Sequence, residues 1–353
     1  MNWFENTYKF PFNSTIPSYV DQFVIEGPSI KKFIKFHKRK FYLFLKKQNS
    51  LEVRQISSKH SKILWINVSA PSLGDSLMDL SSRILLQNKE IDLYTSEKNQ
   101  FLYKNDGYFR NVYTNVSEVK TKYDLIILDS YSIRSIRIKY KIDQKAEYIS
   151  MFGYFNGPEV NRVLFSFNRM AEIIKYKGDV NKINEIAKCS LDLSEEDKLF
   201  VSRISLPESY IVIAVGGEWE YRTYKDWENV ILSITKLNPD ESIVIVGSKN
   251  ATEDAKKILR ACGSTKIVDY VNKLSFMQTI GVIRKAKILI CCDGGLMHGS
   301  NAVGQSVIPL FARLSPDMQL TKSIKSFPLF DRSDVNKIHF SKIIKKYQEF
   351  LAS

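Results

Sequence analysis

Short apolar runs alternate with helix-like segments along most of this chain, and the alternation occurs in two separate sets. The first set begins at Lys62 and the second at Ile211, and every run is far too short to span a membrane. The clearest runs cover residues 63–68, 91–94, 125–128, 211–215, 242–246 and 288–292. Because strands that alternate with helices need crossover connections, the pattern predicts parallel sheets and an α/β fold.

Two such sets in a chain of 353 residues predict two domains of ordinary size. We expect each to be a Rossmann-like, doubly wound parallel sheet, with a ligand cleft between the domains at the carboxyl ends of both sheets. The predicted organisation is a basic and aromatic extension over residues 1–60, a first domain over 61–176, a connection over 177–208, a second domain over 209–330 and a C-terminal helix over 331–353.

Three further elements of the first domain are predicted from local patterns. A helix is expected over residues 76–87, after the first strand. A further strand is expected over 148–155 and a second helix over 159–176. These segments would complete the first sheet and cover one of its faces.

The extension contains a segment, residues 31–47, in which lysine and arginine alternate with large apolar side chains, and no acidic residue lies between Glu26 and Glu52. This composition is typical of an amphipathic basic helix that lies on an anionic membrane surface or along a polyanion. A helix that packs on the first domain and exposes its lysines would have the same composition. Both alternatives stay open on the sequence.

The formal net charge of +14 is compatible with a polyanionic partner, a membrane surface, an anionic substrate or no more than a lysine-rich composition. No grooved motif or aromatic stacking pattern accompanies the basic excess, so a nucleic acid partner is not favoured. The first residues, Met1 to Asn6, lack the basic and apolar regions of a signal peptide. We therefore expect a cytoplasmic protein, with peripheral attachment to the inner face of the membrane through residues 31–47 as the alternative.

The cysteines have no paired metal-ligand spacing. They are Cys189, Cys262, Cys291 and Cys292. The last two are adjacent, and adjacent residues on a strand point to opposite faces, so they suit neither a disulfide nor a shared metal. We expect four reduced, structural thiols and no metal site.

Residues 286–313 predict a strand, a tight turn, a helix and a second strand. The turn is Asp293-Gly294-Gly295. Glycines there let the backbone approach a ligand, and the start of the following helix directs unpaired N–H groups and its positive dipole end outward. Such a corner can bind phosphate. His298, one turn into the helix, is either a structural residue or part of this site.

Two other loops lie at the carboxyl ends of predicted strands. Asp75 follows the first strand, where it is either a helix cap or a general base. Arg222 and Lys225 precede a helix whose dipole does not favour cations, which suggests an anionic partner from outside. An ordinary charged loop, with Trp227 as an anchor in the core, is the competing interpretation.

Together the three loops resemble glycosyltransferase family 9, the ADP-heptose lipopolysaccharide heptosyltransferases and their relatives. That family has a Ser-x-Gly-Asp element after its first strand, an Arg/Lys-x-Trp element opening its second domain and Asp-Ser/Thr-Gly-x-Met-His near its end. The corresponding residues here are Ser72-Leu73-Gly74-Asp75, Lys225-Asp226-Trp227 and Asp293-Gly294-Gly295-Leu296-Met297-His298. Order and spacing match over roughly residues 62–315, and the resemblance implies a GT-B fold.

The resemblance also implies roles for individual residues. Asp75 would be the base that takes the proton of an acceptor hydroxyl, with Ser72 and Gly74 in the acceptor loop, and Glu253 with Gly247 would contact the nucleoside. The donor diphosphate would be held by Lys225, Arg222, Asp293, Gly294, Gly295, Leu296 and His298. Fixed cations and helix-end amides suit a leaving group that gains charge in the transition state, so no metal and no cofactor are needed.

Four positions depart from the family pattern. Gly294 stands where Ser or Thr is usual, Asn67 lies where a basic residue is expected, Pro71 lengthens the first loop and Glu228 replaces a frequent Pro. The sequence predicts an inverting, metal-independent transferase that moves a heptose or other sugar from a nucleotide-sugar to a lipopolysaccharide or other surface-glycan or lipid-linked acceptor. The alternatives are a non-catalytic nucleotide- or polyanion-binding protein of the same fold and a nucleotide-sugar epimerase.

Overall fold

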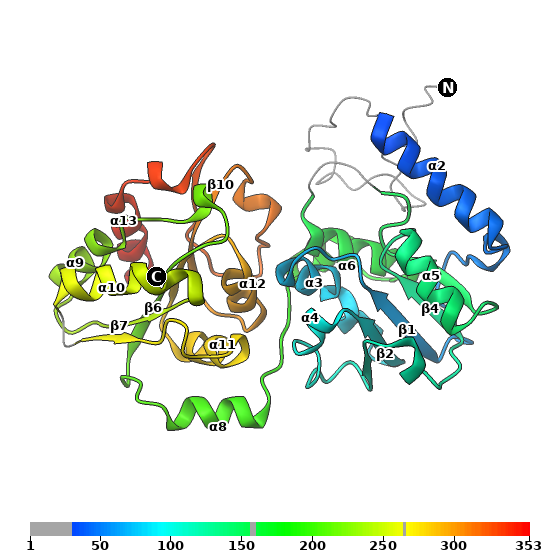
Figure 1. Cartoon of the computed structure of the whole chain (residues 1–353), viewed down its shortest axis with the longest axis horizontal. Helices are drawn as coiled ribbons and strands as arrows, with labels where there is room; N and C mark the ends of the chain where they lie inside the picture. Colours follow the sequence, from blue (N-terminus) through cyan, green and yellow to red (C-terminus); the bar gives the residue numbers. More distant parts are fainter. Residues whose placement is uncertain (1–29, 156–159, 264–265) are drawn as a thin grey trace. The chain divides into compact units, whose positions relative to one another are not determined.

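The computed structural model describes residues 30–155, 160–263 and 266–353 (Figure 1). The chain divides into two compact units, residues 1–187 and 188–353, and each has its own parallel sheet. The division falls inside residues 177–208, which the sequence suggests as the connection. Residues 1–29 of the predicted extension and Glu159, where a helix was expected to begin, lie outside the described residues.

The first unit contains a five-stranded sheet in the order β3-β2-β1-β4-β5. Its strands are β1 (Lys62–Asn67), β2 (Glu90–Thr95), β3 (Val112–Tyr113), β4 (Leu125–Leu128) and β5 (Glu147–Ser150). Neighbouring strands pair in parallel, and Ile63 of β1 lies opposite both Ile91 and Leu125. Strands β2 and β3 are added on one side of β1, and β4 and β5 on the other. The carboxyl ends of β1 and β4 therefore form the topological switch point, where such sheets bind ligands.

Helices pack around this sheet. They are α3 (Leu73–Asp79), α4 (Glu97–Gln100), α5 (Ile133–Ile142), α6 (Arg162–Ile173) and α7 (Val180–Ile186), with short 3-10 helices at Asn49–Leu51, Ser81–Leu86 and Val116–Glu118. The helix predicted over residues 76–87 is wrong in extent. It begins earlier because Ser72 and Asp75 cap its first turn, and after Asp79 it gives way to a 3-10 helix.

One other expectation for the first unit needs correction, and one helix was not expected. The strand predicted over residues 148–155 ends at Ser150, because the Ser150 hydroxyl accepts a hydrogen bond from the Gly153 amide at 2.8 Å and Gly153 turns the chain with φ of 52°. Helix α5 was not predicted; its cap is Ser132, whose hydroxyl accepts from the Ser135 amide. A polar start and alternating arginines made this short helix hard to distinguish from a loop.

Helix α2 (Ile30–Leu45) packs on the first unit (Figure 1). Its Phe36 and Leu43 are buried, and the Phe36 ring lies 4.8 Å from that of Tyr154. At its end, the Lys46 ammonium lies 4.7 Å from the centre of the Tyr140 ring. The structure therefore shows a helix packed on the first unit, which was one of the two alternatives for residues 31–47. Contact with a membrane would have to be made by the opposite, exposed face of this helix.

The second unit contains a six-stranded sheet in the order β11-β10-β9-β6-β7-β8. Its strands are β6 (Tyr210–Ala214), β7 (Ser242–Val246), β8 (Ile267–Asp269), β9 (Leu289–Cys292), β10 (Val307–Ala312) and β11 (Leu329–Asp331), all paired in parallel. The switch point lies between β6 and β9, where Val212 pairs with Leu289. The loops that follow these strands contain Arg222 and Asp293.

The helices of the second unit are α8 (Glu195–Arg203), α9 (Trp227–Leu237), α10 (Thr252–Cys262), α11 (Phe276–Lys285), α12 (Gly295–Ala302) and α13 (Phe340–Leu351). Short 3-10 helices lie at Glu220–Arg222, Lys249–Ala251, Pro316–Met318 and Val335–Lys337. Trp227 is buried in the core against Tyr224, as an anchor should be. The terminal helix belongs to this unit, since the Tyr347 hydroxyl donates to the buried carboxylate of Glu241 at 2.7 Å.

Candidate active site

The loop after β1 places Asp75 in the first turn of α3. Ser72 is the N-cap: its hydroxyl accepts from the Asp75 amide at 3.2 Å, and the Asp75 carboxylate accepts from the Ser72 amide at 3.1 Å and from its hydroxyl at 2.5 Å. Gly74 is buried in the same turn. The capping position is thus held by Ser72, with Asp75 as its reciprocal partner. The Asp75 side chain keeps 20% of its surface exposed.

Arg162, at the start of α6, connects Asp75 to a second carboxylate. Its guanidinium donates from Nε and Nη2 to the two carboxylate oxygens of Asp79 at 2.8 and 2.7 Å, and Nη1 lies 3.6 Å from Oδ1 of Asp75. Burial raises the pKa of Asp79 to about 6, and Arg162 acts against that rise. The bidentate pair fixes a cation beside Asp75.

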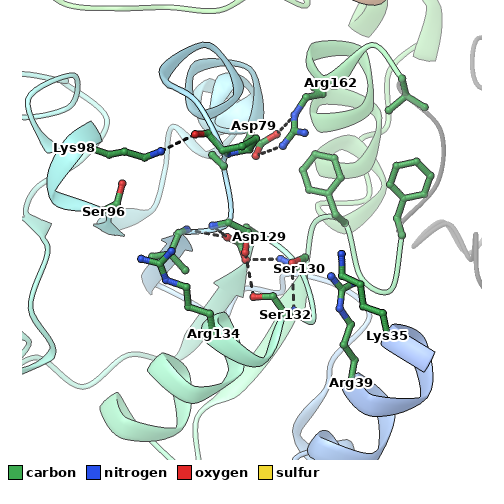
Figure 2. Close-up of a pocket in the computed structure, with 17 residues that line it drawn as sticks. Lys35, Arg39, Asp79, Ser96, Lys98, Asp129, Ser130, Ser132, Arg134 and Arg162 are labelled. Atoms are coloured by element: carbon green, nitrogen blue, oxygen red, sulfur yellow. Dashed lines mark hydrogen bonds and ion pairs between the residues drawn. The ribbon is translucent and has the colours of Figure 1, made fainter. Parts of the chain in front are cut away.

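A cavity of about 790 Å³ opens at the carboxyl ends of β1 and β4 (Figure 2). Its walls include residues of α2, of the loops after β1 and β4, and of the start of α6, where Arg162 lines the cavity and also contacts Asp75. Asp129 ties the two loops together, because its Oδ2 accepts from the Val68 and Ser69 amides at 2.8 and 2.6 Å. The candidate base therefore lies one side chain away from a cavity at the switch point.

In the second unit, the loop after β6 meets the corner after β9 through an ion pair. Arg222 donates from Nη1 to Oδ2 of Asp293 at 2.7 Å, and Nε2 of His298 lies 3.8 Å from the other oxygen, Oδ1. The Asp293 side chain is only 2% exposed, whereas that of Arg222 is 23% exposed. These three predicted site residues come together, and their contacts hold the two loops beside one another.

Lys225 differs from Arg222. Its ammonium pairs with Glu220 at 3.0 Å, and both side chains are largely exposed, at 61% and 84%. Its backbone amide donates to the Asn336 side chain at 2.9 Å, which fixes the backbone of the loop. An exposed pair of this kind contributes little to stability, so its ammonium can exchange Glu220 for another anion.

Helix α12 begins at Gly295, directly after the turn at Gly294. Gly294 has an extended backbone with φ of 163°, and a Cβ built on it would meet nothing within 4 Å. Gly216, in the loop after β6, is different: its φ is +83° and a Cβ there would lie 2.7 Å from that of Ala251. Only the second of these glycines is required by backbone geometry or close packing.

The two predicted nucleoside contacts lie after β7. A Cβ on Gly247 would lie 2.7 Å from the carbonyl oxygen of Val215, so this glycine allows the loops after β6 and β7 to pack closely. Glu253 is exposed in the first turn of α10, where Lys256 lies 2.8 Å away and lowers the pKa of its carboxyl. Gly247 thus has a packing role, and Glu253 is accessible to a ligand.

Among the described residues, no group of three or more His, Cys, Asp or Glu side chains is placed to hold a metal ion. All four cysteines are free thiols. Burial raises the pKa of the Cys291 thiol well above its ordinary value and that of Cys292 to about 12. Both thiols are therefore kept protonated in the core.

The match that decides the family lies mainly in the second unit. Residues 159–347, more than half of the chain, match the sequence model described as glycosyltransferase family 9 (heptosyltransferase). The chain belongs to glycosyltransferase family 9. It is a glycosyltransferase, and the family that the sequence motifs predicted is confirmed.

Solved structures agree with this family 9 assignment at the level of the fold. A glycosyl transferase family 9 protein from Veillonella parvula is 13% identical with a TM-score of 0.69, covering 85% of this chain and 99% of its own. E. coli ADP-heptose LPS heptosyltransferase II is 18% identical with a TM-score of 0.63, covering 82% and 98%. E. coli heptosyltransferase WaaC with ADP is 13% identical with a TM-score of 0.62, covering 82% and 99%.

These matches confirm the predicted α/β, GT-B class with two Rossmann-like parallel sheets. No curated protein sequence matched the chain. Within the residues that the structure describes, no helix is long and apolar enough to cross a membrane.

Several side chains near the two candidate sites were not predicted from the sequence. Arg162, Asp79 and Asp129 surround the cavity beside Asp75. In the second unit, Trp219 is 53% exposed in the loop after β6, and the Arg313 guanidinium lies 3.7 Å from the centre of the Tyr221 ring. Position at a strand end could have suggested Asp129 and Arg313. Arg162 gave no signal, because its partners are more than 80 residues away.

Proposed function

We propose that this family 9 glycosyltransferase moves a heptose or another sugar from an ADP-heptose-like nucleotide-sugar to a lipopolysaccharide or other surface-glycan or lipid-linked acceptor, with inversion and without a metal. The family description and the names of the similar structures, a heptosyltransferase II and WaaC with ADP, support this donor class. The observation that carries the mechanism is the partly exposed carboxylate of Asp75, held by Ser72 and Arg162 beside a cavity.

The base step follows from the surroundings of Asp75. Its carboxylate takes the proton from an acceptor hydroxyl while that oxygen attacks the anomeric carbon. The bond from this carbon to the diphosphate breaks, and the nucleoside diphosphate leaves with the bonding electrons. Nη1 of Arg162 lies 3.6 Å from Oδ1 of Asp75, and the Ser72 hydroxyl donates to the same carboxylate, so the two side chains fix its orientation. Neither contact removes the carboxylate from solvent.

The donor diphosphate is assigned to the corner at Gly294, Gly295 and Leu296 together with Lys225. The start of α12 offers unpaired amides and the positive end of the helix dipole. Lys225 carries an accessible ammonium that neutralises the leaving diphosphate. In this assignment three side chains support the loops of the site and do not bind the diphosphate directly: Arg222, Asp293 and His298. Arg222 is already bound to the buried carboxylate of Asp293.

The membrane part of the proposal concerns α2. We assign the protein to the cytoplasm, with α2 resting on the inner face of the cytoplasmic membrane, where lipid-linked acceptors would be reached. The helix carries large apolar side chains that are more than half exposed: Ile30, Ile34, Phe41, Phe44 and Leu45. Lysines at positions 31, 38 and 40 are also exposed on it. Apolar side chains flanked by lysines suit an anionic lipid surface.

The donor is tested by thermal shift of the purified chain against ADP-, UDP-, GDP- and CDP-sugars, with and without EDTA. We expect one nucleotide to stabilise the protein most, with no effect of EDTA. The stabilising nucleotide-sugar is then used to assay transfer to truncated lipopolysaccharide. The proposal would be contradicted if no nucleotide-sugar raised the melting temperature, or if the stabilisation required a divalent metal.

The base is tested by Asp75→Asn. Asparagine keeps an oxygen that can accept from the Ser72 amide, so the cap of α3 survives while the proton acceptor is lost. We expect transfer to fall by about 10² or more, the usual contribution of a positioned base, with donor binding retained. Asp240→Asn, at a fully exposed carboxylate in the second unit, serves as the control. Full transfer by Asp75→Asn would remove Asp75 from the base role.

A further inference from the structure

Helix α2 contributes two cations to the cavity at the carboxyl ends of β1 and β4. Lys35 and Arg39 lie one turn apart on the helix, and Figure 2 shows both side chains extending in the same direction toward the cavity. The other cations in the wall are Lys98, Arg134 and Arg162. With Asp79 and Asp129 as the two carboxylates, the lining carries a formal excess of three positive charges.

Both carboxylates of the cavity are already engaged by other groups. Asp79 binds Arg162 through both oxygens. Asp129 accepts from two amides through Oδ2, and through Oδ1 from the Ser130 amide and the Ser135 hydroxyl, each at 2.6 Å. The lone pairs of Asp129 are thus used by neutral donors that hold the loops in place.

Arg39 has a buried donor that this arrangement leaves unsatisfied. It is 7% exposed, and its Nη1 atom has no hydrogen-bond partner among the described residues. Burial lowers the pKa of its guanidinium, and the nearby charge of Asp129 opposes that effect in part. A buried cation with an unused donor is costly unless something pairs with it. The Arg39 side chain forms part of the wall of a cavity that is large enough for a ligand.

We propose that this cavity binds an oxyanion, a phosphate or carboxylate group of the acceptor, and that Arg39 of α2 is one of its donors. Arg134, from the start of α5, is the second cation offered from the cavity wall. The assignment to the acceptor rests on the proposed function, because the candidate base Asp75 adjoins the same cavity through Arg162. Helix α2 would then hold an anionic acceptor on one side while its opposite side rests on lipid.

The anion site is tested on the full chain with sulfate and with acetate, each titrated against chloride at constant ionic strength and followed by thermal shift. Sulfate represents a phosphate group and acetate a carboxylate, so the stronger response identifies the chemistry. We compare wild type with Arg39→Gln, Arg134→Gln and the control Lys40→Gln, an exposed lysine of the same helix. The corner at Gly294 can also bind sulfate, so the difference between wild type and variant is the quantity measured.

We expect Arg39→Gln and Arg134→Gln each to weaken the preferred anion at least tenfold, and Lys40→Gln to leave it unchanged. If Arg39→Gln does not fold, the anion titration of Arg134→Gln decides the result, because Arg134 is exposed and its substitution should not disturb folding. Titrations that match wild type in the folded variants, or no response to either anion, would overturn the site.

The acceptor assignment has its own test. The nucleotide that stabilises wild type most is titrated into Arg39→Gln, or into Arg134→Gln if that is the variant that folds. Affinity within twofold of wild type supports an acceptor site, and a tenfold loss would show that the cavity holds the donor instead. If no nucleotide stabilises the chain, the proposed function fails while the sulfate and acetate titrations still decide whether an anion site exists.

Discussion

Arg222 and Lys225 are three residues apart in one loop, yet their surroundings assign them different tasks. The Arg222 guanidinium is bound to Asp293, whose side chain is 2% exposed, so removing it would leave a buried carboxylate unpaired. The Lys225 ammonium pairs with Glu220 in solvent, where such pairs contribute about 0–1 kcal/mol. The first residue stabilises the fold of the loop, and the second is available to a ligand.

This contrast gives a prediction for two alanine variants. We expect Arg222→Ala to lower the free energy of unfolding by about 2 kcal/mol, less than the full value for a buried pair because Arg222 is partly exposed. Lys225→Ala should lower it by no more than about 1 kcal/mol but weaken nucleotide binding about tenfold. Urea denaturation and nucleotide thermal shifts measure the two effects. Equal stability losses, or full nucleotide affinity in Lys225→Ala, would contradict the division of roles.

Gly294 is the departure from the family pattern that the structure clarifies best. Its extended backbone is one that any residue adopts, and the space around a Cβ at this position is open. The hydroxyl that the family usually carries at this corner is therefore missing without any structural requirement for glycine.

We predict that Gly294→Ser folds as well as wild type or gains about 0.5 kcal/mol, because serine reduces the freedom of the unfolded chain. The added hydroxyl should increase the thermal shift produced by the donor nucleotide. The control is Gly216→Ser, where a φ of +83° and a contact of 2.7 Å with the Ala251 Cβ should destabilise the protein. Strong destabilisation by Gly294→Ser would show that the corner does require glycine.

At the scale of the element, α2 has two different faces. One face is buried against the first unit through Phe36 and Leu43, and Arg39 on that side reaches the cavity. Residues 30, 34, 41 and 45 recur at helical spacing on another side, and their side chains are 57–69% exposed. Packing against the first unit explains the apolar residues of the first face. The apolar residues of the second face have no such cover from the part of the chain that the structure describes.

We predict that the double substitution Phe41→Glu and Phe44→Glu abolishes binding to vesicles of phosphatidylglycerol and phosphatidylcholine while leaving the melting temperature unchanged. Both side chains are more than 60% exposed, so folding does not depend on them. Burial of a phenylalanine in lipid contributes about 1.5–3 kcal/mol, so affinity should fall at least a hundredfold. Leu232→Glu, at an exposed leucine of α9, is the matched control in a cosedimentation assay. Equal binding by wild type and the double variant would exclude α2 as the membrane contact.

At the scale of the whole molecule, each of the two units has a complete parallel sheet and its own buried core. In the second unit, helices α9 and α13 close the core through Trp227 and Tyr347. The family match over residues 159–347 covers nearly all of this unit. Both observations indicate that residues 188–353 contain what they need to fold.

We predict that the fragment 188–353 folds alone with a cooperative thermal transition. It should be stabilised by the same nucleotide that stabilises the full chain, since Lys225 and the corner at Gly294 both lie within it. Differential scanning fluorimetry with and without the nucleotide measures this. A fragment that folds but whose melting temperature does not change with the nucleotide would refute donor binding by this unit alone.

Much of the fold was predictable because its signals are local. Apolar runs set β1, β4, β6 and β9, and glycine and aspartate mark the loops that follow them. Elements with weaker patterns failed: α5 was missed, and the end of α3 was placed eight residues too late. Helix ends depend on caps such as the reciprocal Ser72 and Asp75 bonds, which periodicity does not reveal.

The sequence by itself determined the α/β class, the three loops at strand ends and the family, because these depend on short-range periodicity and on the order of short motifs. Only the tertiary structure decided which charges meet. Arg162 reaches Asp79 and Asp75 from more than 80 residues away, Arg222 neutralises Asp293 across 71 residues, and Arg39 enters a cavity built from the ends of β1 and β4. Such contacts arise when packing brings distant side chains into low-dielectric surroundings, where pairing and burial, rather than residue type, set what each charge can do.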